Sequence, residues 1–201
     1  MNTISKKYIE GLKKAYYDNN SSEIWNHFEK IKHGASLENI QKIISVYPFI
    51  PESLLHLLEF VDGTYFTEYI GEKIAFYFLG SDIYEYPYYL LSSFEIIESN
   101  NKIIEYYADF IERKYDEVII DDKITNSIKN IQWLHFSDCM NNGGTSQLFI
   151  DFTPSEKGTK GQVIRFLHDP DEFKVIANSF DDYLGKLIEN EYDFIIEEML
   201  E

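Results

Sequence analysis

The fold is decided by residues 132–152, which read QWLHFSDCMNNGGTSQLFIDF. Aromatic and aliphatic residues dominate both halves of this stretch, and they predict one strand over 132–139 and a second over 147–152. The residues between them, Asn141-Asn142-Gly143-Gly144, are typical of a turn. Two strands joined by so short a connection run antiparallel, so the stretch predicts a β-hairpin.

Toward the C-terminus, strands and turns continue to alternate. Further strands are predicted over 162–168 and 173–177, separated by a turn at Asp169-Pro170-Asp171. Ser179 is placed to cap a helix over 180–188, and residues 191–201 are interpreted as a further, acidic helix. Successive strands joined by short turns predict an antiparallel sheet.

Toward the N-terminus, the apolar residues follow a helical spacing. Four helices are predicted, over residues 4–18, 23–32, 37–47 and 52–61. Short strands follow at 64–66 and 73–78, and 86–90 is read as extended. A helix over 102–115 is then predicted to bury Ile103, Tyr106, Tyr107, Phe110 and Ile111, before a loop or short helix that ends at Asp121-Asp122. This order of elements predicts an α+β fold, an antiparallel β-sheet with helices packed on it.

The charge is strongly negative, with 35 acidic against 18 basic residues and a net charge of −17. Nucleic acids and anionic membranes require basic residues to neutralise phosphate, so neither is expected as a partner. A basic protein is the natural complement, although negative charge also serves solubility alone.

The charge is unevenly distributed along the chain. Residues 1–33 carry six lysines against four acidic residues, whereas 48–122 carry sixteen acidic against four basic residues. We therefore interpret 1–33 as an N-terminal helical extension, 34–190 as the main domain and 191–201 as an acidic C-terminal helix. The single cysteine, Cys139, and the lack of a signal-peptide pattern or a long apolar run predict a cytoplasmic protein.

No motif for catalysis or cofactor binding is found. The five histidines do not pair at ligand spacing, and the loop between Gly158 and Gly161 lacks the pattern of a phosphate-binding loop. The best metal site that the sequence offers combines four residues, His135, Asp138, Asp151 and His168. The alternative is that these are ordinary polar residues on a sheet. No enzymatic activity and no cofactor are therefore expected.

A loop of mixed acidic and tyrosine residues is the strongest candidate for a contact surface. Residues 80–89 have the composition of a protein-binding loop, or alternatively of a tyrosine-rich edge strand that packs on its own core. The candidate partner-binding residues, in this loop and in the later acidic pair, are Asp82, Tyr84, Glu85, Tyr86, Asp121 and Asp122.

Several segments, in order, resemble the SUKH superfamily of fungal cell-wall-assembly regulators and their bacterial relatives. These are residues 47–63 with Pro51 and Asp62-Gly63, 131–136, 148–154 followed by Gly158 and Gly161, 168–169, and 175–184. The resemblance runs from about residue 34 to 190. The motif residues that we interpret as scaffold are Trp133, Asp151, Gly158, Gly161, Gln162 and Phe180.

The resemblance implies a non-enzymatic binding domain. Bacterial members of the superfamily look like immunity proteins that neutralise toxins, often nucleases, so the implied partner is a cognate toxin or another basic protein. Two alternatives stay open at this point. One is a regulatory or scaffolding module of the cell-wall-regulator kind, and the other is a metal-dependent hydrolase. The oligomeric state is left undetermined.

Overall fold

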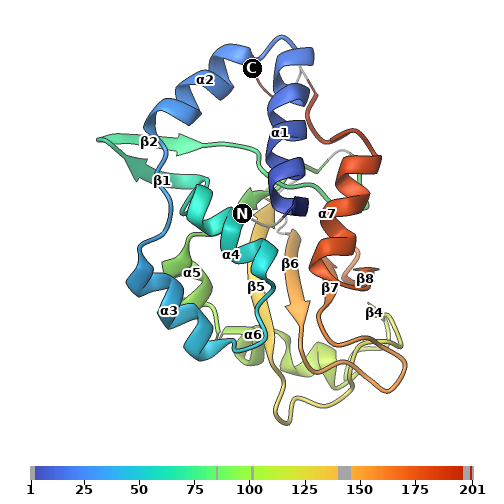
Figure 1. Ribbon diagram of the computed structural model, residues 1–201. Coiled ribbons are helices and arrows are strands. Elements are labelled where there is room, and N and C mark those ends of the chain that lie inside the picture. The colour runs from blue at the N-terminus through green and yellow to red at the C-terminus, as the bar shows by residue number, and fades with distance from the viewer. Residues whose placement is uncertain (1–2, 85, 101, 140–145, 197–199, 201) are drawn as a thin grey trace.

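The computed structural model describes residues 3–84, 86–100, 102–139, 146–196 and 200 (Figure 1). It has an α+β fold, as predicted, with a six-stranded sheet in the order β3-β5-β6-β7-β8-β4 and a separate two-stranded sheet, β1-β2. None of the helices in this described part combines the length and hydropathy needed to cross a bilayer.

Four consecutive strands form the centre of the large sheet. They are β5 (Trp133–Cys139), β6 (Ser146–Asp151), β7 (Gln162–Leu167) and β8 (Glu172–Ala177), and each pairs antiparallel with the next. The predicted strands are therefore confirmed. The turn predicted at 141–144 lies outside the described residues.

The edges of the sheet are two-residue strands. At one edge β3 (Tyr89–Leu90) pairs antiparallel with β5, and at the other β4 (Ile119–Ile120) pairs parallel with β8. The sheet is thus mixed at this edge, where β4 stands in place of the loop or short helix predicted to end at Asp121-Asp122. A two-residue strand has no periodicity to read. The small sheet pairs β1 (Tyr65–Tyr69) with β2 (Glu72–Ala75).

The described residues form seven helices. Their bounds are α1 Thr3–Asp18, α2 Ser22–Ile31, α3 Leu37–Val46, α4 Glu52–Phe60, α5 Ser93–Glu98, α6 Lys102–Ile111 and α7 Phe180–Glu189. Five of them match predicted helices closely, and α6 ends four residues earlier than predicted. The helix α5, which has six residues, was not predicted, although Ser92 and Glu95 form a complete capping box at its start.

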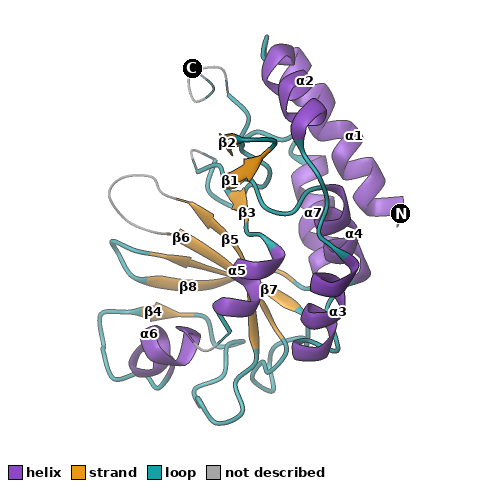
Figure 2. Cartoon of the chain, turned by 90° about the vertical axis from the view of Figure 1, so that its left-hand side faces the viewer, coloured by secondary structure: helices purple, strands orange, loops and turns teal. Residues whose placement is uncertain are grey.

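Both faces of the large sheet are buried, each in its own apolar cluster. Leu134, Leu148 and Val163 point into the larger cluster, against the side where Figure 2 shows α1, α4 and α7. Trp133 and Phe149 point the opposite way, into a smaller cluster with one face of α6. Neighbouring residues on one strand are buried in different clusters. The sequences of these strands are therefore almost continuously apolar.

The two N-terminal helices belong to the larger cluster. Tyr8, Tyr16 and Trp25 are fully buried in it. The hydroxyl of Tyr8 donates to the carbonyl of Phe78 over 2.6 Å, and that of Tyr16 donates to the carbonyl of Tyr77 over 2.7 Å. The segment interpreted from its charge as an extension therefore shares its core with the rest of the molecule.

The C-terminal segment differs from the prediction. Residues 191–196 form turns and irregular structure in place of the expected acidic helix, and 197–199 and 201 lie outside the described residues. Glu191 and Tyr192 adopt positive φ values of 55° and 58°, which end α7 and turn the chain back. Tyr192, Phe194 and Ile195 are then buried, and Tyr192 donates to the carbonyl of Tyr8 over 2.9 Å. Burial of these apolar residues prevails over the acidic pattern.

Candidate functional site

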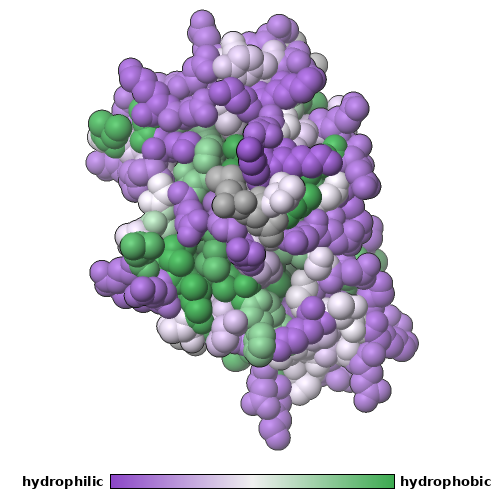
Figure 3. Space-filling view, in the orientation of Figure 1, coloured by the Kyte–Doolittle hydropathy of each residue, from purple (hydrophilic) through white to green (hydrophobic). Residues whose placement is uncertain are grey.

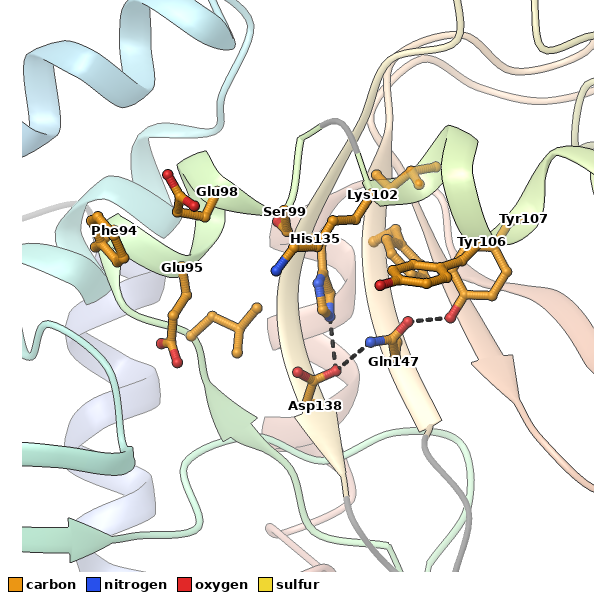
Figure 4. A pocket seen from close by; sticks show the side chains of 13 residues that line it. Phe94, Glu95, Glu98, Ser99, Lys102, Tyr106, Tyr107, His135, Asp138 and Gln147 are labelled. Carbon is orange, nitrogen blue, oxygen red and sulfur yellow. Dashed lines mark hydrogen bonds and ion pairs between the residues drawn. The ribbon is translucent and has the colours of Figure 1, made fainter.

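A cleft of about 330 Å³ opens between α5 and α6, over the strands β5 and β6. Figure 4 shows α5 side chains on one side, α6 side chains on the other, and strand side chains between them. The lining residues are Leu91, Phe94, Glu95, Glu98, Ser99, Lys102, Ile103, Tyr106, Tyr107, His135, Asp138, Gln147 and Phe149. The cleft lies on the face of the sheet that holds the smaller cluster.

His135 and Asp138 meet on the floor of the cleft because β5 is irregular. In a regular strand, residues three apart point to opposite faces. Here the register against β6 shifts between His135 and Ser137, and this bulge returns Asp138 to the face of His135. The His135 Nε2 and the Asp138 Oδ1 are 2.9 Å apart.

Two further side chains extend this contact into a relay. Gln147 lies directly opposite Asp138 in the register of β5 and β6, and its amide nitrogen donates to Asp138 Oδ1 over 2.8 Å. The hydroxyl of Tyr107 donates to the Gln147 carbonyl oxygen (Figure 4). Burial, followed by the nearby charge of Asp138, raises the pKa of Tyr107 above its ordinary value, so the tyrosine remains a donor.

One ring nitrogen of His135, Nδ1, has no hydrogen-bond partner among the described residues. Within the described residues, the ring has two hydrogen-bond contacts, to the carbonyl of Ser137 at 3.2 Å and to Asp138, and both involve Nε2. Since both partners are acceptors, Nε2 carries a proton, and Nδ1 is an acceptor when the ring is neutral. The side chain is only 9% exposed, and no described residue hydrogen-bonds to Nδ1.

The walls of the cleft combine aromatic rings with carboxylates. Phe94 is 64% exposed and Tyr106 is 63% exposed, although both are large rings. One carboxylate oxygen of Glu95 is committed to the cap of α5, where it accepts from the Ser92 amide and hydroxyl. Glu98 is exposed, and no described residue forms an ion pair or hydrogen bond with its side chain.

The four residues of the metal hypothesis do not come together. Asp151 lies opposite Trp133, at the far end of β5 and β6 from Asp138, and His168 follows β7 and pairs with Asp171 at 2.7 Å. Within the described ranges, no group of three or more potential ligands could hold a metal ion. The structure therefore contradicts the metal-dependent hydrolase built on these residues.

Asp82 is bound within the molecule. Its carboxylate accepts from Arg165 Nε over 2.5 Å and from Lys174 Nζ over 2.7 Å, and Glu172 pairs with the same arginine. Burial would raise the pKa of Asp82, but the hydrogen bonds and charges of Arg165 and Lys174 outweigh burial and hold this pKa below its ordinary value. Asp82 therefore ties its loop to β7 and β8.

The other candidate contact residues are scattered. Tyr84 is exposed, Tyr86 is partly buried, and Glu85 lies outside the described residues. Asp121 accepts from the backbone amides of Lys123 and Val175. Asp122 forms an exposed ion pair of 2.6 Å with Lys157.

The scaffold residues lie where the chain turns or packs. Trp133 and Phe180 are buried in the two clusters. Gln162 donates to Asp151 over 2.9 Å, and the amide of Thr153 also donates to Asp151. A Cβ on Gly158 would meet the carbonyl oxygen of Lys123 at 2.4 Å, and Gly161 has a positive φ of 89°.

Sequence reasoning missed most of the cleft. Phe94, Glu98 and Gln147 were not singled out, and Tyr106 was wrongly placed on the buried face of its helix. Tyr106 lies at the edge of the buried stripe that Ile103, Tyr107 and Ile111 define, so it turns outward. The capping box at Ser92 was the one local signal that would have indicated α5 and hence this wall.

Residues 34–186 match the model of the SMI1/KNR4 family (SUKH-1). The match includes the cleft and the whole of the large sheet, and it leaves out α1 and α2. A comparison with curated proteins gives no match to this chain.

Proposed function

Because the chain belongs to the SMI1/KNR4 family (SUKH-1), we propose that it is an immunity protein that neutralises a basic protein toxin by binding and covering it. The SUKH domain occurs in toxin-immunity proteins and in KNR4-like regulators, and its members are generally non-enzymatic. What we propose beyond the family is that the partner is a toxin and that this chain covers it. We place this binding in the cytoplasm, in agreement with a single, buried Cys139.

The observation that carries the proposal is the charge of the segment that forms the walls of the cleft and continues to β4 at the far edge of the sheet. Residues 93–122, which include α5, α6 and β4, carry nine acidic against three basic residues. One of those three, Arg113, points inward and donates to the backbone carbonyls of Ile111, Ile124 and Thr125. A surface of this kind attracts a cationic protein and speeds its capture.

Exposed apolar residues lie beside these carboxylates. Figure 3 shows apolar residues gathered over α3, α4 and α5, and α3 packs against α5. The large exposed apolar residues of α3 and α5 are Leu37, Ile44 and Phe94, and Tyr106 follows on α6. An apolar and aromatic centre with a charged surround is the usual composition of a protein contact surface.

Neither arginine is available to bind phosphate. Arg113 is held by backbone carbonyls, and Arg165 is only 2% exposed and is neutralised by Asp82 and Glu172. This supports a protein partner over a nucleic acid, because phosphate recognition depends on accessible basic side chains.

The test is binding to, and protection from, a toxin encoded beside this chain. The purified protein should retain the basic toxin domain in a pull-down, with an affinity that falls as salt is raised, and its expression should rescue a poisoned cell. Absence of both binding and rescue for every neighbouring toxin would overturn the proposal. Capture of a resident host protein in a locus without a toxin would support the regulatory alternative instead.

A further inference from the structure

We propose that the cleft between α5 and α6 binds an arginine side chain of the partner protein. The inference rests on the proposed function, because it assigns one anchoring contact to the binding of a basic protein. It adds the site on this chain and the chemical group that the site recognises.

The floor of the cleft offers acceptors for N–H donors. His135 Nδ1, which is an acceptor when the ring is neutral, belongs to a side chain that is nine-tenths buried, and the contact of Nε2 with Asp138 orients the ring. Asp138 uses Oδ1 for both His135 and Gln147, and its side chain remains 25% exposed. A polar nitrogen held in this way favours a ligand that donates a hydrogen bond into the cleft.

The charge of the walls favours a cation. Glu95, Glu98 and Asp138 line the cleft together with a single cation, Lys102. Glu98 has no ion-pair partner among the described residues, so its charge is free to pair with a ligand. A charge-assisted hydrogen bond from a guanidinium to a carboxylate is stronger than a neutral one.

The aromatic walls favour a flat cation over a compact one. The exposed rings of Phe94 and Tyr106 stand on opposite sides of the cleft (Figure 4). A guanidinium stacks on such rings and donates several hydrogen bonds in its plane, whereas an ammonium is more strongly hydrated and lacks a planar face. These features together indicate arginine as the preferred side chain.

The charge of Lys102 opposes the binding of a cation, so removing it should change the affinity for arginine in the opposite direction to removing a carboxylate. Figure 4 shows its side chain extending over the cleft near His135. Lys102→Gln removes the repulsion, so it should strengthen arginine binding, whereas Glu98→Gln removes an attraction and should weaken it. Each effect should be about threefold to fivefold, as for partly exposed ion pairs.

The experiment uses the full chain, labelled with ¹⁵N, and titrates it with N-acetyl-arginine methylamide. Nuclear magnetic resonance should show shifts confined to the cleft, including a change at the Nδ1 of His135. The matched lysine amide should bind more weakly and the neutral citrulline amide should give no shifts. Absence of arginine shifts, or equal shifts for arginine and lysine spread along α6, would overturn the inference.

A matched variant separates the cleft from the general charge of the surface. Glu105 is an exposed acidic residue of α6 that does not line the cleft, so Glu105→Gln should leave arginine binding unchanged while Glu98→Gln weakens it. Equal weakening by both variants would contradict a specific site.

Because this titration needs no toxin, its result is distinguishable from a failure of the proposed function. Arginine binding without any toxin partner would overturn only the immunity proposal. A toxin complex whose affinity is unchanged by Glu98→Gln and by His135→Gln, in variants that retain the folded spectrum, would overturn only the arginine site.

Discussion

The two faces of the large sheet are covered to different extents. On the larger-cluster face, α1, α4 and α7 close the core, and buried tyrosines such as Tyr8, Tyr16 and Tyr183 donate to backbone carbonyls. On the other face, α6 covers only part of the sheet and leaves His135, Asp138 and Gln147 beside a cleft. Both faces contain a packed apolar core, but the second also has polar groups that packing alone does not require.

The largest expected effect is the loss of packing under α6. Trp133→Ala removes a fully buried ring that contacts Phe149 and Phe173, and it should lower the free energy of unfolding by roughly 3–5 kcal/mol. Chemical denaturation measures this loss. A loss below about 1 kcal/mol would mean that the smaller cluster is not a packed core.

The next effect concerns Asp82, which the sequence indicated as a candidate contact residue. Its pairing with the buried Arg165 leads to a different expectation. Asp82→Lys should destabilise the protein by about 3 kcal/mol, because the guanidinium loses a partner and gains a repelling charge. Thermal unfolding of this variant beside Asp122→Lys, whose ion pair is exposed, measures the difference. Equal stability of the two variants would contradict a stabilising pair between Asp82 and the buried Arg165.

A pH-dependent effect is expected at Asp151. Burial raises the pKa of Asp151 from 3.8 to about 6, against the hydrogen bonds from Thr153 and Gln162 that lower it. Between these two values the folded chain holds a proton that the unfolded chain has lost, so the contribution of Asp151 to stability falls as the pH rises.

Asp151→Asn tests this sign because the amide stays neutral. The free energy of unfolding of the variant, relative to the natural chain, should rise by about 2–3 kcal/mol between about pH 4 and pH 7. Urea unfolding of both proteins at the two pH values measures it. A difference that does not change with pH would show that Asp151 titrates normally.

A smaller effect is expected within the relay. Tyr107→Phe keeps the ring against Phe166 and Phe173 but removes the hydrogen bond to Gln147, so it should cost about 1 kcal/mol. The same variant should also alter the nitrogen chemical shifts of His135, because the position of Asp138 depends on Gln147. Unchanged shifts would indicate that the relay does not hold the histidine.

The sequence predicted the fold where the signals are local. The strands β5 to β8 combine apolar runs with turn residues, and α7 has a cap at Ser179, whose side chain accepts from the amide of Asp182. Apart from the capping box at Ser92, the cleft depends on features that no local pattern contains. The bulge that joins His135 to Asp138 is set by pairing with β6, and α5 has only six residues.

The candidate contact residues also depend on contacts between distant parts of the chain, which local sequence does not indicate. Arg165 lies 83 residues from Asp82, so the composition of the loop gave no indication that this acidic residue is paired. In the same way, the charge of residues 1–33 gave no indication that Tyr8 and Tyr16 of α1 are buried in the larger cluster.

The most direct measurement is the affinity for the partner toxin domain of two charge-reversal variants, one on each side of the molecule. Glu98→Lys changes the cleft, and Glu10→Lys changes the exposed surface of α1. Calorimetric titration at low and physiological salt should show a loss of about tenfold or more for Glu98→Lys and little change for Glu10→Lys, with the difference decreasing as salt is raised. Equal affinities for the two variants would contradict the assignment of binding to the carboxylate-rich cleft.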